Sequence, residues 1–164
     1  MRFYCRWIDA FNYRVGRAAM YLLFVMMGIL LWSSFSKTFL LPSLWTLEMA
    51  QFTLTAYYLL GGPYSMQLGG HVRMDLFYGS WSDRTKAGMD ALTVACLLFY
   101  LGVLLVGGIE STSYSLQYGE RSYSAWRPYM SPIKIVMCLG VLLMLLQTVS
   151  VLFKDLARLR GEEI

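Results

Sequence analysis

Long apolar runs without a charged residue dominate the chain, and each is long enough to cross a membrane as a helix. They occupy residues 18–36, 49–70, 91–109 and 135–153. A hydrocarbon core about 30 Å thick requires about 20 helical residues. Transmembrane strands would instead alternate apolar and polar residues over roughly ten positions, which these runs do not. The pattern therefore predicts an all-α membrane protein with four transmembrane helices, forming a single integral membrane domain over residues 1–164.

Composition points to the same class. Apolar residues make up 57% and charged residues 15% of the chain, against roughly 45–50% and 25% in soluble globular proteins. Disordered chains are excluded because they are poor in apolar residues and rich in charge. The net charge of +4 is distributed between the apolar runs, with no basic stripe to follow phosphates. Nucleic acid is therefore not an expected partner.

The distribution of basic residues predicts the orientation in the membrane. Most of the 14 Lys and Arg residues lie near the two termini and between the second and third runs. Those on the other side are Lys37, Arg121, Arg127 and Lys134. Because cytoplasmic loops carry the excess of Lys and Arg, both termini are predicted to be cytoplasmic.

Two flanking segments, residues 1–17 and 71–82, are predicted to be short interfacial amphipathic helices. In the first, Phe3, Trp7 and Phe11 recur every four residues among arginines. This pattern is typical of a helix in the headgroup region, with its rings inward and its arginines toward lipid phosphates. A frayed basic terminus is the alternative interpretation.

The end of the second run contains Gly61, Gly62 and Pro63. Proline removes one backbone donor and clashes with the preceding turn. A kink or break is therefore predicted near Leu59 and Leu60.

Polar residues also share one face of the second run, at offsets of three and four: Glu48, Gln51, Thr55 and Tyr58. Glu48 is either a carboxylate that couples transport to protons or cations, or a structural residue paired with Lys134 or hydrogen-bonded across helices. Glu110 and Lys134 are expected at a similar depth. Because Glu48 lies near the end of its run, where a charge costs less than at mid-membrane, the structural interpretation is favoured.

Two further clusters are candidates for interaction. His71, Arg73 and Asp75 lie close together on the cytoplasmic side, either as a proton switch at the histidine or, as we favour, as an anchoring cluster. Ala87, Ala91 and Ala95 form a small-residue face on the third run, which lets helix backbones approach closely. Their partner helix belongs either to this chain or to another subunit.

The sequence offers no catalytic, cofactor-binding or metal-binding constellation. The three cysteines lie far apart without a CxxC pair, and no GxSxG, GxGxxG or phosphate-loop motif occurs. A four-helix membrane oxidoreductase is disfavoured because the lone His71 cannot supply both axial ligands of a bis-histidine haem.

Several motifs resemble those of one family. They are Leu60-Gly61-Gly62-Pro63-Tyr64, Gly70-His71-Val72-Arg73-Met74-Asp75 and Trp81-Ser82-Asp83-Arg84, followed by Gly119-Glu120-Arg121-Ser122, Pro128, Pro132, Gly140 and Gln147. With the four runs, they resemble the DctQ-type small membrane subunit of a tripartite ATP-independent periplasmic (TRAP) transporter. The lone Glu48 departs from the family, in which acidic residues often occur in pairs at the start of the second span.

The resemblance implies a scaffold role in a bacterial inner membrane. In the family, a large membrane subunit carries the substrate and sodium sites, and a periplasmic binding protein captures the solute, usually an organic acid. The small subunit packs beside the large one, and it is thought to help dock the binding protein. Here docking would involve the regions around 37–45 and 111–130. No cofactor is expected in this chain, and membrane lipids are further partners.

An alternative function belongs to a different class. The chain would be a self-sufficient small homodimeric transporter that uses Glu48 as its coupling carboxylate. Replacing Glu48 by Gln would then abolish transport, whereas an accessory subunit predicts a partial loss at most.

Overall fold

The computed structural model describes residues 2–68 and 83–159 and is helical throughout most of them. The helices are α1 (Arg2–Phe39), α2 (Thr46–Gln67), α4 (Asp83–Tyr118) and α5 (Ser131–Leu159). Within the described ranges the only β pairing is an isolated antiparallel bridge between Arg121 and Tyr129. The predicted all-α fold is confirmed.

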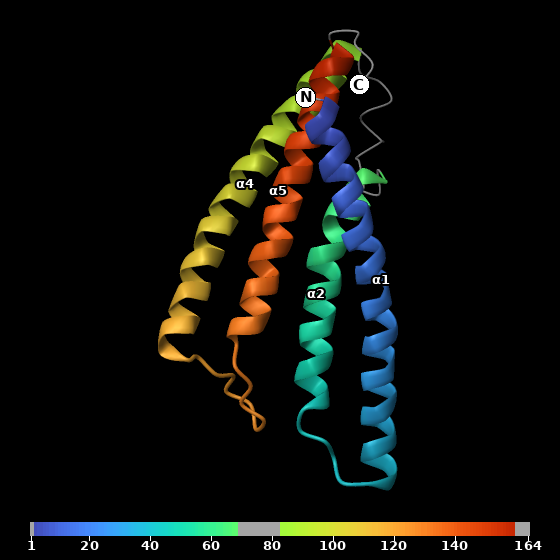
Figure 1. Ribbon diagram of the computed structural model, residues 1–164, viewed down its shortest axis with the longest axis vertical. Helices are drawn as coiled ribbons and strands as arrows, with labels where there is room; N and C mark the ends of the chain where they lie inside the picture. Colours follow the sequence, from blue (N-terminus) through green and yellow to red (C-terminus); the bar gives the residue numbers. More distant parts are fainter. Residues whose placement is uncertain (1, 69–82, 160–164) are drawn as a thin grey trace.

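The helices run alternately in opposite directions (Figure 1). The start of α1 and the end of α5 lie at one end of the bundle, and the α1–α2 and α4–α5 loops lie at the other. α1 packs on α2, α2 packs on α5, and α4 packs on α5, while α1 also contacts α5. α5 therefore touches each of the other three helices and joins the two helical hairpins.

Three of the helices are long and apolar enough to cross a membrane, at Phe3–Phe39, Leu92–Tyr118 and Ser131–Lys154. The runs predicted at 18–36, 91–109 and 135–153 lie within these three helices, α1, α4 and α5. The run predicted at 49–70 coincides with α2 up to Gln67. α2 is not among these three, because Thr, Gln, Tyr, Gly and Pro residues interrupt its apolar side chains.

Residues 2–17 are helical as predicted, so the alternative of a frayed terminus is wrong, but they do not form a short helix of their own. α1 runs without interruption from Arg2 to Phe39. The reason lies in its inner face, where Cys5, Ile8 and Asn12 are buried at helical spacing against the rest of the bundle. This packing keeps the first turns on the same helix as the span that follows. The predicted interfacial segment 71–82 lies outside the described residues.

Of the kink or break predicted near Leu59 and Leu60, the break does not occur, since α2 continues through Pro63 to Gln67. Pro63 is fully buried. The preceding turn packs directly on α5, with Leu59 against Gly140. These tertiary contacts support the turn in which proline removes a hydrogen bond.

Candidate functional site: a buried polar network

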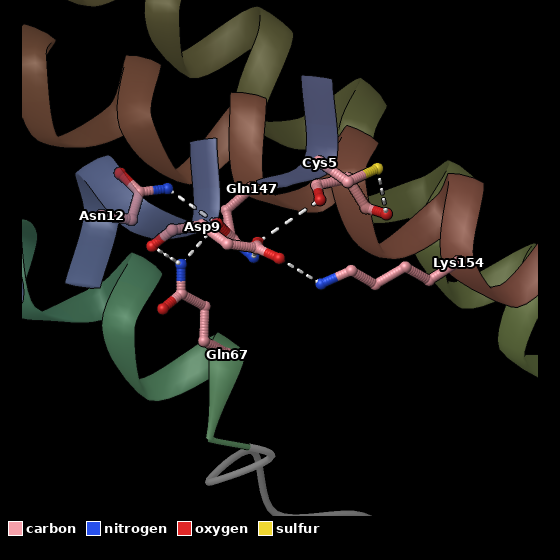
Figure 2. A network of polar contacts seen from close by, with 7 residues as sticks. Cys5, Asp9, Asn12, Gln67, Gln147 and Lys154 are labelled. Atoms are coloured by element: carbon pink, nitrogen blue, oxygen red, sulfur yellow. Dashed lines mark hydrogen bonds and ion pairs between the residues drawn. The ribbon is translucent and has the colours of Figure 1, made fainter. Parts of the chain in front are cut away.

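A cluster of polar side chains joins three helices near the end of the bundle where α1 begins (Figure 2). We call it the polar network; it consists of Asp9 and Asn12 of α1, Gln67 of α2, and Gln147, Ser150 and Lys154 of α5. Several members are almost entirely buried, with Asn12 1% exposed and both Gln147 and Ser150 0% exposed.

The Gln147 side chain is the centre of the amide part of the network. Its Oε1 accepts hydrogen bonds from Asn12 Nδ2 at 2.7 Å and from Gln67 Nε2 at 3.1 Å. Its own Nε2 donates to Asp9 Oδ1 at 3.0 Å. One buried amide of α5 therefore binds side chains of α1 and α2 at the same time.

Asp9 is the second centre. Its Oδ1 also lies 3.5 Å from Ser150 Oγ, and its Oδ2 pairs with the ammonium group of Lys154. The backbone carbonyl of Asp9 accepts a hydrogen bond from Gln67 Nε2 at 3.0 Å. A carboxylate at the edge of an apolar bundle is thus neutralised by one cation and bonded by neutral donors, which is what burying charge requires.

Helical spacing explains why these residues meet. Asp9 and Asn12 are three apart on α1, and Gln147, Ser150 and Lys154 follow offsets of three and four on α5, so each set lies on one helix face. These faces turn toward each other where α1 contacts α5. Cys5 extends the contact, because its thiol lies 3.9 Å from the carbonyl oxygen of Ser150.

The network fixes how α1, α2 and α5 pack against one another. Buried amides and charges without partners cost free energy, so the arrangement in which these side chains bond one another is strongly preferred. One acceptor is left over, because Asn12 Oδ1 is buried and has no hydrogen-bond partner within the described residues. Among those residues, no group of three or more His, Cys, Asp or Glu side chains is placed to hold a metal ion.

Sequence reasoning missed most of this network. Asp9, Asn12 and Gln67 were not candidates, and Gln147 entered only within a motif. A usable signal was nevertheless present, because Asp9 and Asn12 fall on the helix face that also carries Cys5 and Ile8. A polar pair on an otherwise buried face requires partners from another helix.

Glu48 lies at the other end of α2 and is 7% exposed. Its Oε1 accepts a hydrogen bond from Ser122 Oγ at 3.2 Å, which links the start of α2 to the α4–α5 loop. Its Oε2 is buried without a hydrogen-bond partner among the described residues. Glu48 is therefore a buried carboxylate bound to a loop residue rather than to a neighbouring helix.

The predicted pairing of Glu48 with Lys134 is wrong. Lys134 forms its ion pair with Glu120, and its Nζ lies 3.5 Å from the carbonyl oxygen of Ser111. Glu110 is exposed on α4. Lys134 pairs with Glu120 because the loop folds back over the first turn of α5. The hydrogen bond from Met130 N to Glu120 O, at 3.0 Å, shows this fold of the loop.

The α4–α5 loop has a defined conformation. Gly119 and Arg127 have positive φ values of 58° and 49°. Across the loop, Ser122 N donates to Pro128 O at 2.9 Å, and the Arg121 guanidinium lies 4.2 Å from the centre of the Tyr129 ring. This ordered loop presents Ser122 to Glu48.

The other candidate residues do not form one site. Gln51 is exposed on α2, whereas Pro63 is buried. Of the small-residue face, Ala87 and Ala91 belong to α4, and the side chain of Ala95 is exposed. His71, Arg73 and Asp75 lie outside the described residues.

Comparison with known proteins establishes the family. A family model described as tripartite ATP-independent periplasmic transporters, DctQ component, matches residues 26–158. No curated protein and no solved structure matches the chain. The matched region includes the four charge-free runs except the start of the first, and it contains α2, α4 and nearly all of α5. The chain therefore belongs to the DctQ component family and is a small membrane component of a tripartite ATP-independent periplasmic transporter.

Proposed function

We propose that this chain is the small permease subunit that scaffolds the large membrane subunit in binding-protein-dependent uptake of an organic acid or a similar solute. The observation that carries the proposal is the family match over residues 26–158. Sodium coupling and the solute site belong to the large subunit. The periplasmic binding protein is the third component.

The exposed face of α4 supports a scaffold role. α4 packs on α5, which leaves its other side free within the described part of the bundle. Leu92, Phe99 and Val106 are 58%, 76% and 58% exposed on that side, and the small Ala95 lies between them. A small residue within an apolar face allows a neighbouring helix to approach closely. We assign this face to contact with the large subunit.

The proposed topology has four spans, with α2 as the fourth. α2 contains 22 residues and is about 33 Å long at 1.5 Å per residue, which matches a hydrocarbon core about 30 Å thick. The excess of Lys and Arg at the termini favours cytoplasmic ends in a bacterial inner membrane. The α1–α2 and α4–α5 loops would then face the periplasm.

Reconstitution tests the scaffold role. The large subunit, with the binding protein and a sodium gradient, is placed in liposomes with and without this chain, and uptake of organic acids is measured. The proposal expects uptake to require this chain and the two membrane chains to copurify in mild detergent. Full uptake by the large subunit without this chain would refute it.

Glu48 supports the alternative of a homodimeric transporter, because its carboxylate is buried with one oxygen unpartnered among the described residues. The Glu48→Gln variant separates the two functions, since an amide keeps the size of the side chain but cannot carry a proton. Under our proposal uptake by the reconstituted complex falls partially at most. Complete loss at unchanged membrane levels, together with uptake by this chain alone, would establish the alternative.

A further inference from the structure

The outer face of the first turns of α1 combines aromatic rings with arginines. Its rings are Phe3, Trp7 and Phe11, which are 85%, 64% and 45% exposed. Arg6, Arg14 and Arg17 are exposed on the same segment. We call these six residues the basic–aromatic face.

The packing of α1 holds this face outward. Cys5, Ile8 and Asn12 occupy the opposite side of the helix and are 2%, 4% and 1% exposed. Turning the rings inward would require breaking the hydrogen bond between Asn12 and Gln147, which measures 2.7 Å. The exposure of the rings is therefore a consequence of the polar network.

The side chains of the face are arranged beside one another. The Trp7 and Phe11 rings are stacked, with centroids 5.9 Å apart and planes 12° from parallel. The guanidinium of Arg17 lies 5.7 Å from the centre of the Tyr13 ring. Flat aromatic surface and positive charge thus alternate over three helical turns.

Within the part of the chain that the structure describes, the ion pairs are Lys134–Glu120 and Lys154–Asp9, so none of them includes an arginine of the face. Asp9 is the only acidic residue among residues 1–17. Its carboxylate is already paired with Lys154 of α5. An anion that approaches the face therefore meets the arginines without competition from this carboxylate.

The length of α1 places the face at the membrane surface. With 38 residues, α1 is about 57 Å long, whereas the hydrocarbon core is about 30 Å thick. The charge-free part of the helix begins at residue 18. Asp9 pairs with Lys154, which directly follows the charge-free run of α5. The surface of the hydrocarbon core therefore crosses α1 between Asp9 and residue 18. The turns around this crossing meet the headgroup layer, where tryptophan rings are favoured and arginines meet phosphates.

From these observations we infer that the basic–aromatic face binds anionic phospholipid headgroups, with the arginines on the phosphates and the rings packed among the headgroups. This binding is a property of this chain and does not depend on its role in transport. Each arginine contributes roughly a fivefold preference for an anionic over a zwitterionic surface.

The test uses the full-length chain in mild detergent, titrated with phosphatidylglycerol or phosphatidylcholine while bound lipid is counted by native mass spectrometry. The wild type should bind phosphatidylglycerol at least about tenfold more tightly, and R6Q/R14Q/R17Q should lose most of that preference. Inorganic phosphate at the same concentrations should not displace the lipid. If the triple variant kept the wild-type preference, or if phosphate alone competed fully, the inference would be overturned.

A matched variant controls for general loss of charge. K37Q/R121Q/R127Q removes three basic side chains near the opposite end of the bundle and should keep the preference. Circular dichroism of both triple variants checks that each is folded. An equal loss of preference in the two variants would contradict a local site.

Trp7 provides a direct report on where the lipid lies. In nanodiscs that contain brominated phosphatidylglycerol, bromine quenches tryptophan fluorescence at short range. The difference in quenching between the wild type and W7F should show that Trp7 is among the quenched residues. A larger fractional quenching in W7F than in the wild type would mean that the removed ring was shielded from lipid, and it would overturn the aromatic part of the inference.

Discussion

Gly140 of α5 lies so close to Leu59 of α2 that a Cβ atom at position 140 would be 2.8 Å from Leu59 Cβ and 3.0 Å from the Leu59 carbonyl oxygen. Pro63, four residues after Leu59, has no N–H to donate to that oxygen. The glycine thus allows the α5 backbone to approach the one turn of α2 that lacks its own hydrogen bond. Weak Cα–H···O contacts are typical of such close crossings.

Replacing Gly140 by alanine should destabilise the bundle by about 1–3 kcal/mol, because the added methyl group overlaps backbone atoms that cannot rotate away. Unfolding of the purified protein in detergent, followed by circular dichroism, measures the loss. Gly28→Ala is the control, because nothing lies within 4 Å of a Cβ at position 28. The control should be neutral or stabilising by up to about 1 kcal/mol. Equal stability of the two variants would show that this crossing is looser than described.

Gly16 of α1 meets Tyr64 of α2 even more closely. A Cβ at position 16 would lie 2.3 Å from Tyr64 Cβ and 2.5 Å from its Cγ. Gly16→Ala should therefore separate α1 from α2 and cost at least as much as Gly140→Ala, about 2–3 kcal/mol. Thermal unfolding followed by tryptophan fluorescence compares the two variants. A melting temperature equal to that of the wild type would contradict this prediction.

Gln147→Leu tests the centre of the polar network. Leucine removes the acceptor shared by Asn12 and Gln67 as well as the donor to Asp9. Buried polar groups left without partners cost about 1–3 kcal/mol each, so the variant should lose at least about 2 kcal/mol of stability.

A double-mutant cycle with Asn12→Leu distinguishes the bond from simple packing. If Asn12 and Gln147 are coupled, the double variant should lose less stability than the sum of the losses in the two single variants. The reason is that each single variant leaves one of the two polar side chains without its partner, whereas the double variant removes both. Strict additivity of the two losses would show that the side chains do not interact.

The two charges of the network should not be equivalent. Lys154 and Asp9 are 35% and 29% exposed, so water screens their attraction and Lys154→Met should cost about 1 kcal/mol or less. Asp9→Ala should cost more, because the Asp9 carboxylate also accepts bonds from Gln147 and Ser150. Chemical unfolding at low and high salt measures both. The exchange variant D9K/K154D should remain less stable than the wild type. If it were as stable as the wild type, Asp9 would contribute only through its ion pair with Lys154 and not through its hydrogen bonds.

Ser122→Ala should weaken the attachment of the α4–α5 loop to α2. Glu48 is 7% exposed and accepts its hydrogen bond from Ser122. Loss of that donor should cost about 1–3 kcal/mol. Hydrogen exchange of the loop amides should increase, whereas Ser113→Ala on the exposed side of α4 should leave them unchanged. Equal exchange in the two variants would mean that the loop is held by other contacts.

The helices were predictable because their cause is local. A charge-free run of about 20 residues is helical in lipid whatever its neighbours are, since every backbone group must be bonded within the segment. The partners of polar residues were less predictable. Glu48 and Lys134 were compatible by depth and charge. The conformation of the loop instead pairs Lys134 with Glu120 and places the Ser122 hydroxyl where it donates to Glu48.

The helical class, the positions of the apolar runs and, through its motifs, the family of the chain all follow from the order of its amino acids. Periodicity and hydropathy carry this information because they depend on neighbours along one chain. The folded bundle is needed to see that residues 2–17 continue α1, that Pro63 does not end α2, and that Asp9, Asn12 and Gln147 meet. These outcomes depend on contacts between helices distant in sequence, where close packing and the cost of unpaired polar groups select one arrangement.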